Sequence, residues 1–170
     1  ADAGGAAGPV SVTWQPLLVW GLFATGLLTV VLAGSQGLGW TRISLPYLLG
    51  TMLTPRRDRA MWLGMAMHLV MGLVFAFLYA LVFEGWGRSG PGLGALLGLF
   101  HAVFVLTAGM QVLPAMHPRM VGRHEGPTPT RQLEPPGFLG LHYGRRTPLI
   151  SLVAHVLYGA SLGAFYPVAG

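Results

Sequence analysis

The chain has 170 residues, of which 53% are hydrophobic and only 9% are charged, and its mean hydropathy is +0.60. Soluble domains carry about 25% charged residues, so this composition excludes an ordinary soluble domain. The net charge is +5, but the arginines are scattered through connecting segments and form no basic face, so we expect no nucleic-acid partner. There is no cysteine, which excludes disulfide bonds and thiolate metal sites.

Residues 1–16 begin with a run rich in alanine and glycine and are predicted to form a flexible, outward-facing tail. Four apolar stretches follow, each close to the roughly 20 residues that a helix needs to cross a bilayer core. The sequence therefore predicts an all-α fold, in which residues 17–170 form a single transmembrane domain, an integral membrane four-helix bundle. The predicted helices span about residues 17–34, 60–84, 91–114 and 148–167.

The arginines are divided unevenly among the connections between these helices. Nine of the ten lie in the connections from the first helix to the second and from the third to the fourth, whereas only Arg88 lies between the second and the third. Connections rich in arginine stay in the cytoplasm under the positive-inside rule. We therefore expect a multi-pass protein of the bacterial inner (plasma) membrane with both termini on the outer side.

The second and fourth predicted helices share a pattern of small residues and a histidine at four-residue spacing, followed by a tyrosine. Each histidine also lies nine residues after an arginine. The pattern predicts two tandem helical hairpins, a parallel internal repeat about an axis along the membrane normal. Chance similarity is the alternative, because glycine and leucine are common throughout the chain. The two copies are Gly64, His68, Gly72, Ala76 and Tyr79, and Ser151, His155, Gly159, Gly163 and Tyr166.

The third predicted helix opens with another row of small residues, Gly90, Gly94 and Gly98. Small residues let the backbones of neighbouring helices approach closely, which is how helices associate in lipid. The three histidine-bearing helices are therefore expected to pack into a compact bundle.

Three short motifs carry a resemblance to a known group of proteins. They are residues 46–52, the pair Leu113 and Pro114 with His117 and Pro118, and the repeated histidine pattern. In these motifs the chain resembles a family of small bacterial four-helix integral membrane proteins of unknown function, over about residues 21–166. The resemblance implies the four-helix fold, and it implies no activity, ligand or residue role.

Three histidines, His68, His101 and His155, fall inside predicted membrane helices, with His68 and His155 at matching depth. Ionisable residues are rare in membrane helices and mark sites or bundle interiors. One interpretation is that they are cofactor-binding residues, because neutral imidazole ligates haem iron and the magnesium of chlorophyll-type tetrapyrroles. The favoured interpretation is structural, with each ring hydrogen-bonded to a carbonyl or to a hydroxyl such as that of Ser151 or Tyr79. Proton transfer is a third alternative.

The connection at residues 115–147 is long and rich in proline, and it is the surface on which we expect a partner. Its residues His117, His124, Glu125 and His142 could form a metal site. Their spacing matches no known ligand motif, so a solvated loop is the favoured interpretation.

The sequence contains no Ser-His-Asp arrangement, paired carboxylates, phosphate-binding glycine loop or HExxH motif, so we do not predict an enzyme. The leading hypothesis is a non-catalytic accessory or structural subunit of a larger membrane assembly, such as an energy-transducing one. The alternatives are a membrane protein that binds haem or a chlorophyll-type cofactor, and a small-solute channel or transporter. Expected partners are membrane lipids and other membrane subunits or a second copy.

Overall fold

The computed structural model describes residues 11–122 and 126–169, which are all-helical apart from one isolated bridge between Met120 and Leu133. This confirms the predicted all-α class. The long elements are the α-helices α1, α3, α4 and α6, and the shorter ones include the π-helix η1 and the 3₁₀-helix η2. In chain order they are α1 (Trp14–Gly37), α2 (Leu45–Gly50), α3 (Arg57–Gly85), α4 (Pro91–Phe104), η1 (Val105–Gly109), α5 (Met110–Met116), η2 (Phe138–Tyr143) and α6 (Thr147–Phe165).

Four helical segments are long and apolar enough to cross a membrane: α1, α3, α6 and the continuous run α4–η1–α5 over Pro91–Met116. Their positions agree closely with the predicted helices. The boundaries differ by up to three residues: α1 ends at Gly37 and α3 begins at Arg57, each three residues beyond the prediction, and α1 begins at Trp14, inside the predicted tail. Pro16 lies in the first turn of α1, where a missing N–H group leaves no hydrogen bond unmade, so the helix can start before it. The first ten residues of the predicted tail lie outside the described residues.

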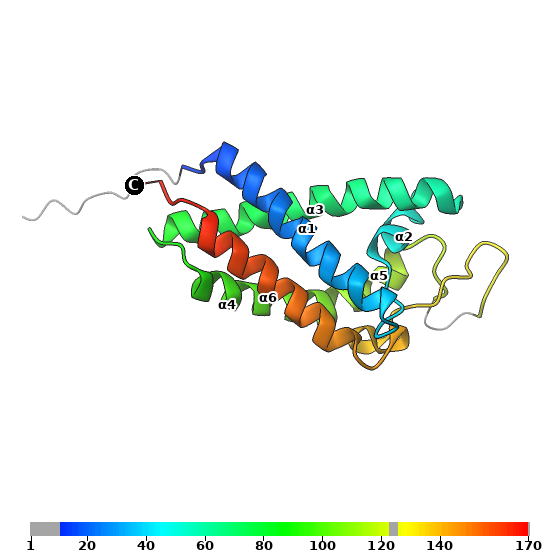
Figure 1. The fold of residues 1–170 in the computed structure, drawn as a ribbon. Helices are drawn as coiled ribbons and strands as arrows, with labels where there is room; N and C mark the ends of the chain where they lie inside the picture. The colour runs from blue at the N-terminus through cyan, green and yellow to red at the C-terminus, as the bar shows by residue number, and fades with distance from the viewer. Residues whose placement is uncertain (1–10, 123–125, 170) are drawn as a thin grey trace, which may run out of the picture.

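The four segments pack in the order α3, α1, α6, α4, so that α6 lies between α1 and α4 (Figure 1). The described chain ends lie where α3 turns into α4, which we call the terminus end. The short helices α2, α5 and η2 gather at the opposite end with the long connections, which we call the arginine-rich end (Figure 1). The arrangement fits a multi-pass membrane protein.

The helices α4 and α6 touch through their backbones. A Cβ atom built on Gly94 would overlap the carbonyl oxygen of Gly159, and one on Gly159 would overlap that of Gly94. Gly98 lies equally close to the carbonyl oxygen of His155, and Gly163 to that of Gly90. Since no side chain fits in this interface, the predicted close-packing role of the glycine row is confirmed for α4.

The small residues of α3 have different neighbours from those of α6. Gly64 packs against the carbonyl group of Pro46 near the start of α2, and Gly72 packs against the Thr25 side chain of α1. The matching glycine in α6, Gly159, packs instead against α4. The shared sequence pattern therefore serves two kinds of contact, and the tandem hairpin repeat stays a prediction.

Glu84, in the last turn of α3, holds the two chain ends together. The Tyr166 hydroxyl donates a hydrogen bond to Glu84 Oε1 at 2.7 Å, and the Ala169 N–H donates to Glu84 Oε2 at 3.0 Å. The Thr13 N–H in turn donates to the Tyr166 hydroxyl oxygen at 3.2 Å. The start of α1 and the end of α6 are thus fixed beside each other.

We expect the Gly159→Ala variant to lose about 1–3 kcal/mol of unfolding free energy, because its methyl group would force α4 and α6 apart. Gly92→Ala is the matched control, since a Cβ atom at Gly92 meets nothing within 4 Å and alanine favours a helix by up to about 1 kcal/mol. Unfolding in detergent followed by circular dichroism measures both. Equal stability of Gly159→Ala and wild type would contradict the backbone contact.

Candidate functional site

The three histidines singled out in the sequence come together in the structure. His68 on α3, His101 on α4 and His155 on α6 line one cavity of about 100 Å³. The ring centroids of His101 and His155 lie 4.6 Å apart, and the His101 ring stacks on Phe75 with its centroid 3.8 Å away. The remaining wall is mostly apolar and includes residues of α1 and of the segment before α2.

Each histidine has a hydrogen bond on one ring nitrogen. His68 Nε2 lies 3.1 Å from the Thr29 hydroxyl, and His101 Nδ1 lies 3.4 Å from the Tyr79 hydroxyl. His155 Nδ1 donates to the carbonyl oxygen of Ser151 at 2.7 Å. The hydrogen bonds of His68 and His101 join two helices each, whereas that of His155 stays within α6. The geometry therefore agrees with the structural interpretation and leaves the second nitrogen of each ring for other use.

Sequence reasoning missed Thr29 as a partner of His68. Thr25 and Thr29 lie one turn apart on the face of α1 that packs against α3, and Thr25 fills the space beside Gly72. Two threonines four residues apart within an apolar stretch could have indicated a polar contact on that face of α1. The Tyr158 hydroxyl, which also borders the cavity, donates to the Gly72 carbonyl oxygen at 2.6 Å.

The cavity is small for the cofactors considered from the sequence. Sites for small molecules usually enclose about 300–1,000 Å³, so a haem or magnesium tetrapyrrole would require the helices to separate. The contact between the His101 and His155 rings also leaves no gap for a flat macrocycle between those two residues. Cofactor ligation by the three histidines stays a prediction.

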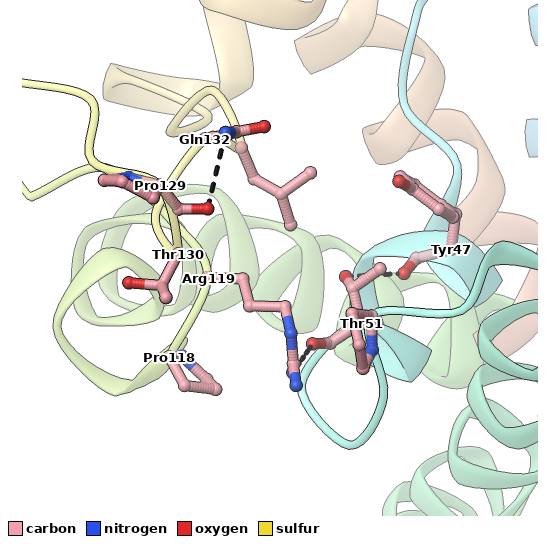
Figure 2. A pocket seen from close by; sticks show the side chains of 9 residues that line it. Tyr47, Thr51, Pro118, Arg119, Pro129, Thr130 and Gln132 are labelled. Atoms are coloured by element: carbon pink, nitrogen blue, oxygen red, sulfur yellow. Dashed lines mark hydrogen bonds between the residues drawn. The ribbon is translucent and has the colours of Figure 1, made fainter.

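A second, larger pocket of about 430 Å³ lies at the arginine-rich end, between α2 and the connection that follows α5 (Figure 2). In Figure 2 the Arg119 side chain points toward Thr51, to whose carbonyl oxygen it donates at 2.5 Å. On the facing wall, Gln132 donates to the carbonyl oxygen of Pro129 at 3.4 Å. The Arg119 and Gln132 side chains are therefore already hydrogen-bonded within the fold, and the Arg119 bond connects this segment to α2.

His117 is buried at this end of the molecule, with 1% of its surface exposed, and it connects the end of α2 to the segment that follows α5 by hydrogen bonds. Its Nε2 donates to the Leu48 carbonyl oxygen at 3.0 Å and lies 3.2 Å from the Thr51 hydroxyl. Its Nδ1 accepts the N–H of Arg119 at 3.1 Å, so both nitrogens of the neutral ring are satisfied. Burial lowers the pKa of His117.

The two described residues of the metal site considered for this connection, His117 and His142, bind other partners. His117 is engaged as above, while His142 lies on η2 and its Nδ1 bonds to the carbonyl oxygen of Pro135. His124 and Glu125 lie outside the described residues. Within residues 11–122 and 126–169, no group of three or more histidine, aspartate or glutamate residues is placed to hold a metal ion.

Comparison of the chain with protein-family models, curated proteins and solved structures finds no match. The resemblance to small bacterial four-helix membrane proteins therefore stays a prediction.

We expect the pH dependence of stability to contain a contribution from His117. Because the pKa of His117 is lowered in the folded protein, the unfolded chain binds its proton more readily, and stability falls as pH drops through the ordinary value of 6.5. Between about pH 7 and pH 5, wild type should therefore lose more stability than His117→Gln, which does not titrate. Chemical unfolding in detergent at several pH values measures this, and parallel profiles would contradict it.

Proposed function

We propose that the protein is a non-catalytic accessory or structural subunit of a larger membrane assembly. The observation that carries this proposal is a row of small residues on the outward side of α1. Gly26, Ala33 and Gly37 lie on one side of the helix at spacings of seven and four residues, with the exposed Val30 between the first two and Gly34 beside them. A Cβ atom built on Gly26, Gly34 or Gly37 would meet nothing within 4 Å.

In α3, α4 and α6, glycines in rows of small residues are covered by a neighbouring segment. Gly94 and Gly159 contact each other's backbones, and Gly64 contacts the backbone next to α2. Lipid is as apolar as a leucine side chain, so close approach at small residues is a main source of helix association in membranes. The unfilled row on α1 supports a contact with a helix of another subunit or of a second copy.

The exposed tryptophans support a bilayer around the bundle. Trp14 and Trp86 lie at the terminus end, and Trp40 and Trp62 lie at the arginine-rich end. Their exposed fractions range from 45% for Trp40 to 81% for Trp62. Tryptophan concentrates where the bilayer meets water, so two pairs at opposite ends correspond to the two interfaces.

The arginines support an inner-membrane location with both termini on the outer side. Arg88 lies at the terminus end, between α3 and α4. The other described arginines flank α2, α5 and η2 or begin α3 and α6, all at the arginine-rich end. The positive-inside rule assigns that end to the cytoplasm.

Replacing Gly26 and Gly34 together by isoleucine is expected to abolish the proposed contact. The two side chains point into open space, so the fold should keep its unfolding temperature while recovery of the partner from native membranes falls at least tenfold. Affinity purification from the native host with native mass spectrometry measures both partner and copy number.

Gly92→Ile is the matched control, because it adds the same side chain at another open glycine, on α4. It should recover the partner as wild type does. A wild-type protein that purifies as a stable monomer without a partner would overturn the proposal, as would a double variant that retains the partner.

A further inference from the structure

The hydrogen bonds of the histidine cavity determine where the ring protons lie. The carbonyl oxygen of Ser151 only accepts, so His155 Nδ1 must carry the proton of the neutral ring. His155 Nε2 is then an unprotonated nitrogen with a free lone pair. It has no hydrogen-bond partner among the described residues, although only 6% of the surface of His155 is exposed.

His68 reaches the same state by another route. The Thr29 hydroxyl donates its single proton to the carbonyl oxygen of Thr25 at 2.7 Å. It can therefore only accept from His68 Nε2, 3.1 Å away, which leaves His68 Nδ1 unprotonated.

These lone pairs are not sealed within packed protein. Among the described residues, no fully buried side-chain nitrogen or oxygen lacks a hydrogen-bond partner. His155 Nε2 lacks one, so it must be accessible, and the accessible space beside His155 is the cavity. His68 Nδ1 is accessible for the same reason, and His68 borders both this cavity and a second one of about 150 Å³ between α1 and α3.

The surroundings favour a neutral ligand. The residues that line the cavity include no aspartate, glutamate, lysine or arginine. A charged ligand would lie unpaired among apolar side chains, which costs several kcal/mol or more. The complementary group is therefore an uncharged hydrogen-bond donor.

The size and shape of the cavity favour a single ring. An apolar cavity of roughly 150 Å³ accepts benzene, and this one, of about 100 Å³, is smaller but open on one side, so it holds at most a single ring with part of that ring outside the cavity. Phe75, His101 and Tyr158 contribute aromatic surface to its wall. Met71 lines the cavity and is 44% exposed, so its side chain stands between the cavity and the surface that lipid would cover.

We propose that this cavity binds a neutral, lipid-soluble molecule with a ring hydroxyl, of the chemical class of a hydroquinone carrying an isoprenoid tail. One hydroxyl of the ligand donates to His155 Nε2. The second hydroxyl donates to His68 Nδ1, or the first does so after the ring has turned within the cavity. The ring packs against Phe75 and Tyr158, and the tail leaves beside Met71 into the bilayer.

The test uses the full chain in lipid nanodiscs and three matched probes with one isoprene unit: a hydroquinone, its dimethyl ether and the corresponding quinone. Anaerobic calorimetric titration should show saturable binding of the hydroquinone. The ether and the quinone have no hydroxyl proton to donate, so each should bind at least tenfold more weakly. Equal binding of hydroquinone and ether, or no saturable binding of the hydroquinone, would overturn the proposal.

Variants connect the binding to the named nitrogen. His155→Phe should weaken hydroquinone binding at least tenfold, whereas His142→Phe, at an exposed histidine outside the bundle, should leave it unchanged. Unchanged binding in His155→Phe would overturn the proposal.

A spectroscopic measurement keeps the proposal testable if His155→Phe fails to fold. In wild type labelled with ¹⁵N-histidine, NMR should show His155 Nε2 as unprotonated, and its signal should move on addition of the hydroquinone but not of the ether. A protonated Nε2, or a signal that ignores the hydroquinone, would contradict the assignment.

Discussion

The backbone contact between α4 and α6 is the interaction on which the rest of the structure depends. It is made possible by glycines at matching heights, and it places His101 directly beside His155. The connection is physical, because the carbonyl oxygen against which Gly98 packs belongs to His155 itself. One side of α6 packs against α4 and another side packs against α1. The cavity lies between these helices and α3. The packing of α4 against α6 therefore also forms part of the candidate site.

The helix α3 is held in a different way. It makes few contacts with α6, and its close backbone contact is with α2, where Gly64 meets Pro46. Side-chain hydrogen bonds connect α3 to α1, α4 and α6. Tyr158 reaches across from α6 to the carbonyl oxygen of Gly72, Thr29 from α1 meets His68, and His101 from α4 meets Tyr79. In an apolar environment such bonds persist because the alternative is an unpaired polar group, although each contributes only about 1 kcal/mol. Among the residues that the structure describes, the buried polar side chains are thus hydroxyls and imidazoles, with no aspartate, glutamate, lysine or arginine.

Much of this could be predicted from the sequence, because apolar length and glycine spacing act locally. The helix positions and the close-packing role of Gly94 and Gly98 belong to this class. Which helix fills which row could not be predicted, since Gly64 meets the short helix α2, whose position depends on the whole arginine-rich end. The same holds for His117, which was grouped with possible metal ligands. Its partners lie 69 residues away at Leu48 and 2 residues away at Arg119, and only the folded chain brings them together.

The carboxylate of Glu84 has a consequence beyond local stability. By binding the Tyr166 hydroxyl and the Ala169 N–H, it anchors the end of α6, and Thr13 joins the same cluster through Tyr166. The start of α1 and the end of α6 therefore lie beside each other at the same end of the bundle. A reporter attached at Thr13 would stand next to a reporter attached at Ala169, so two halves of a split fluorescent protein could reassemble there within a single molecule.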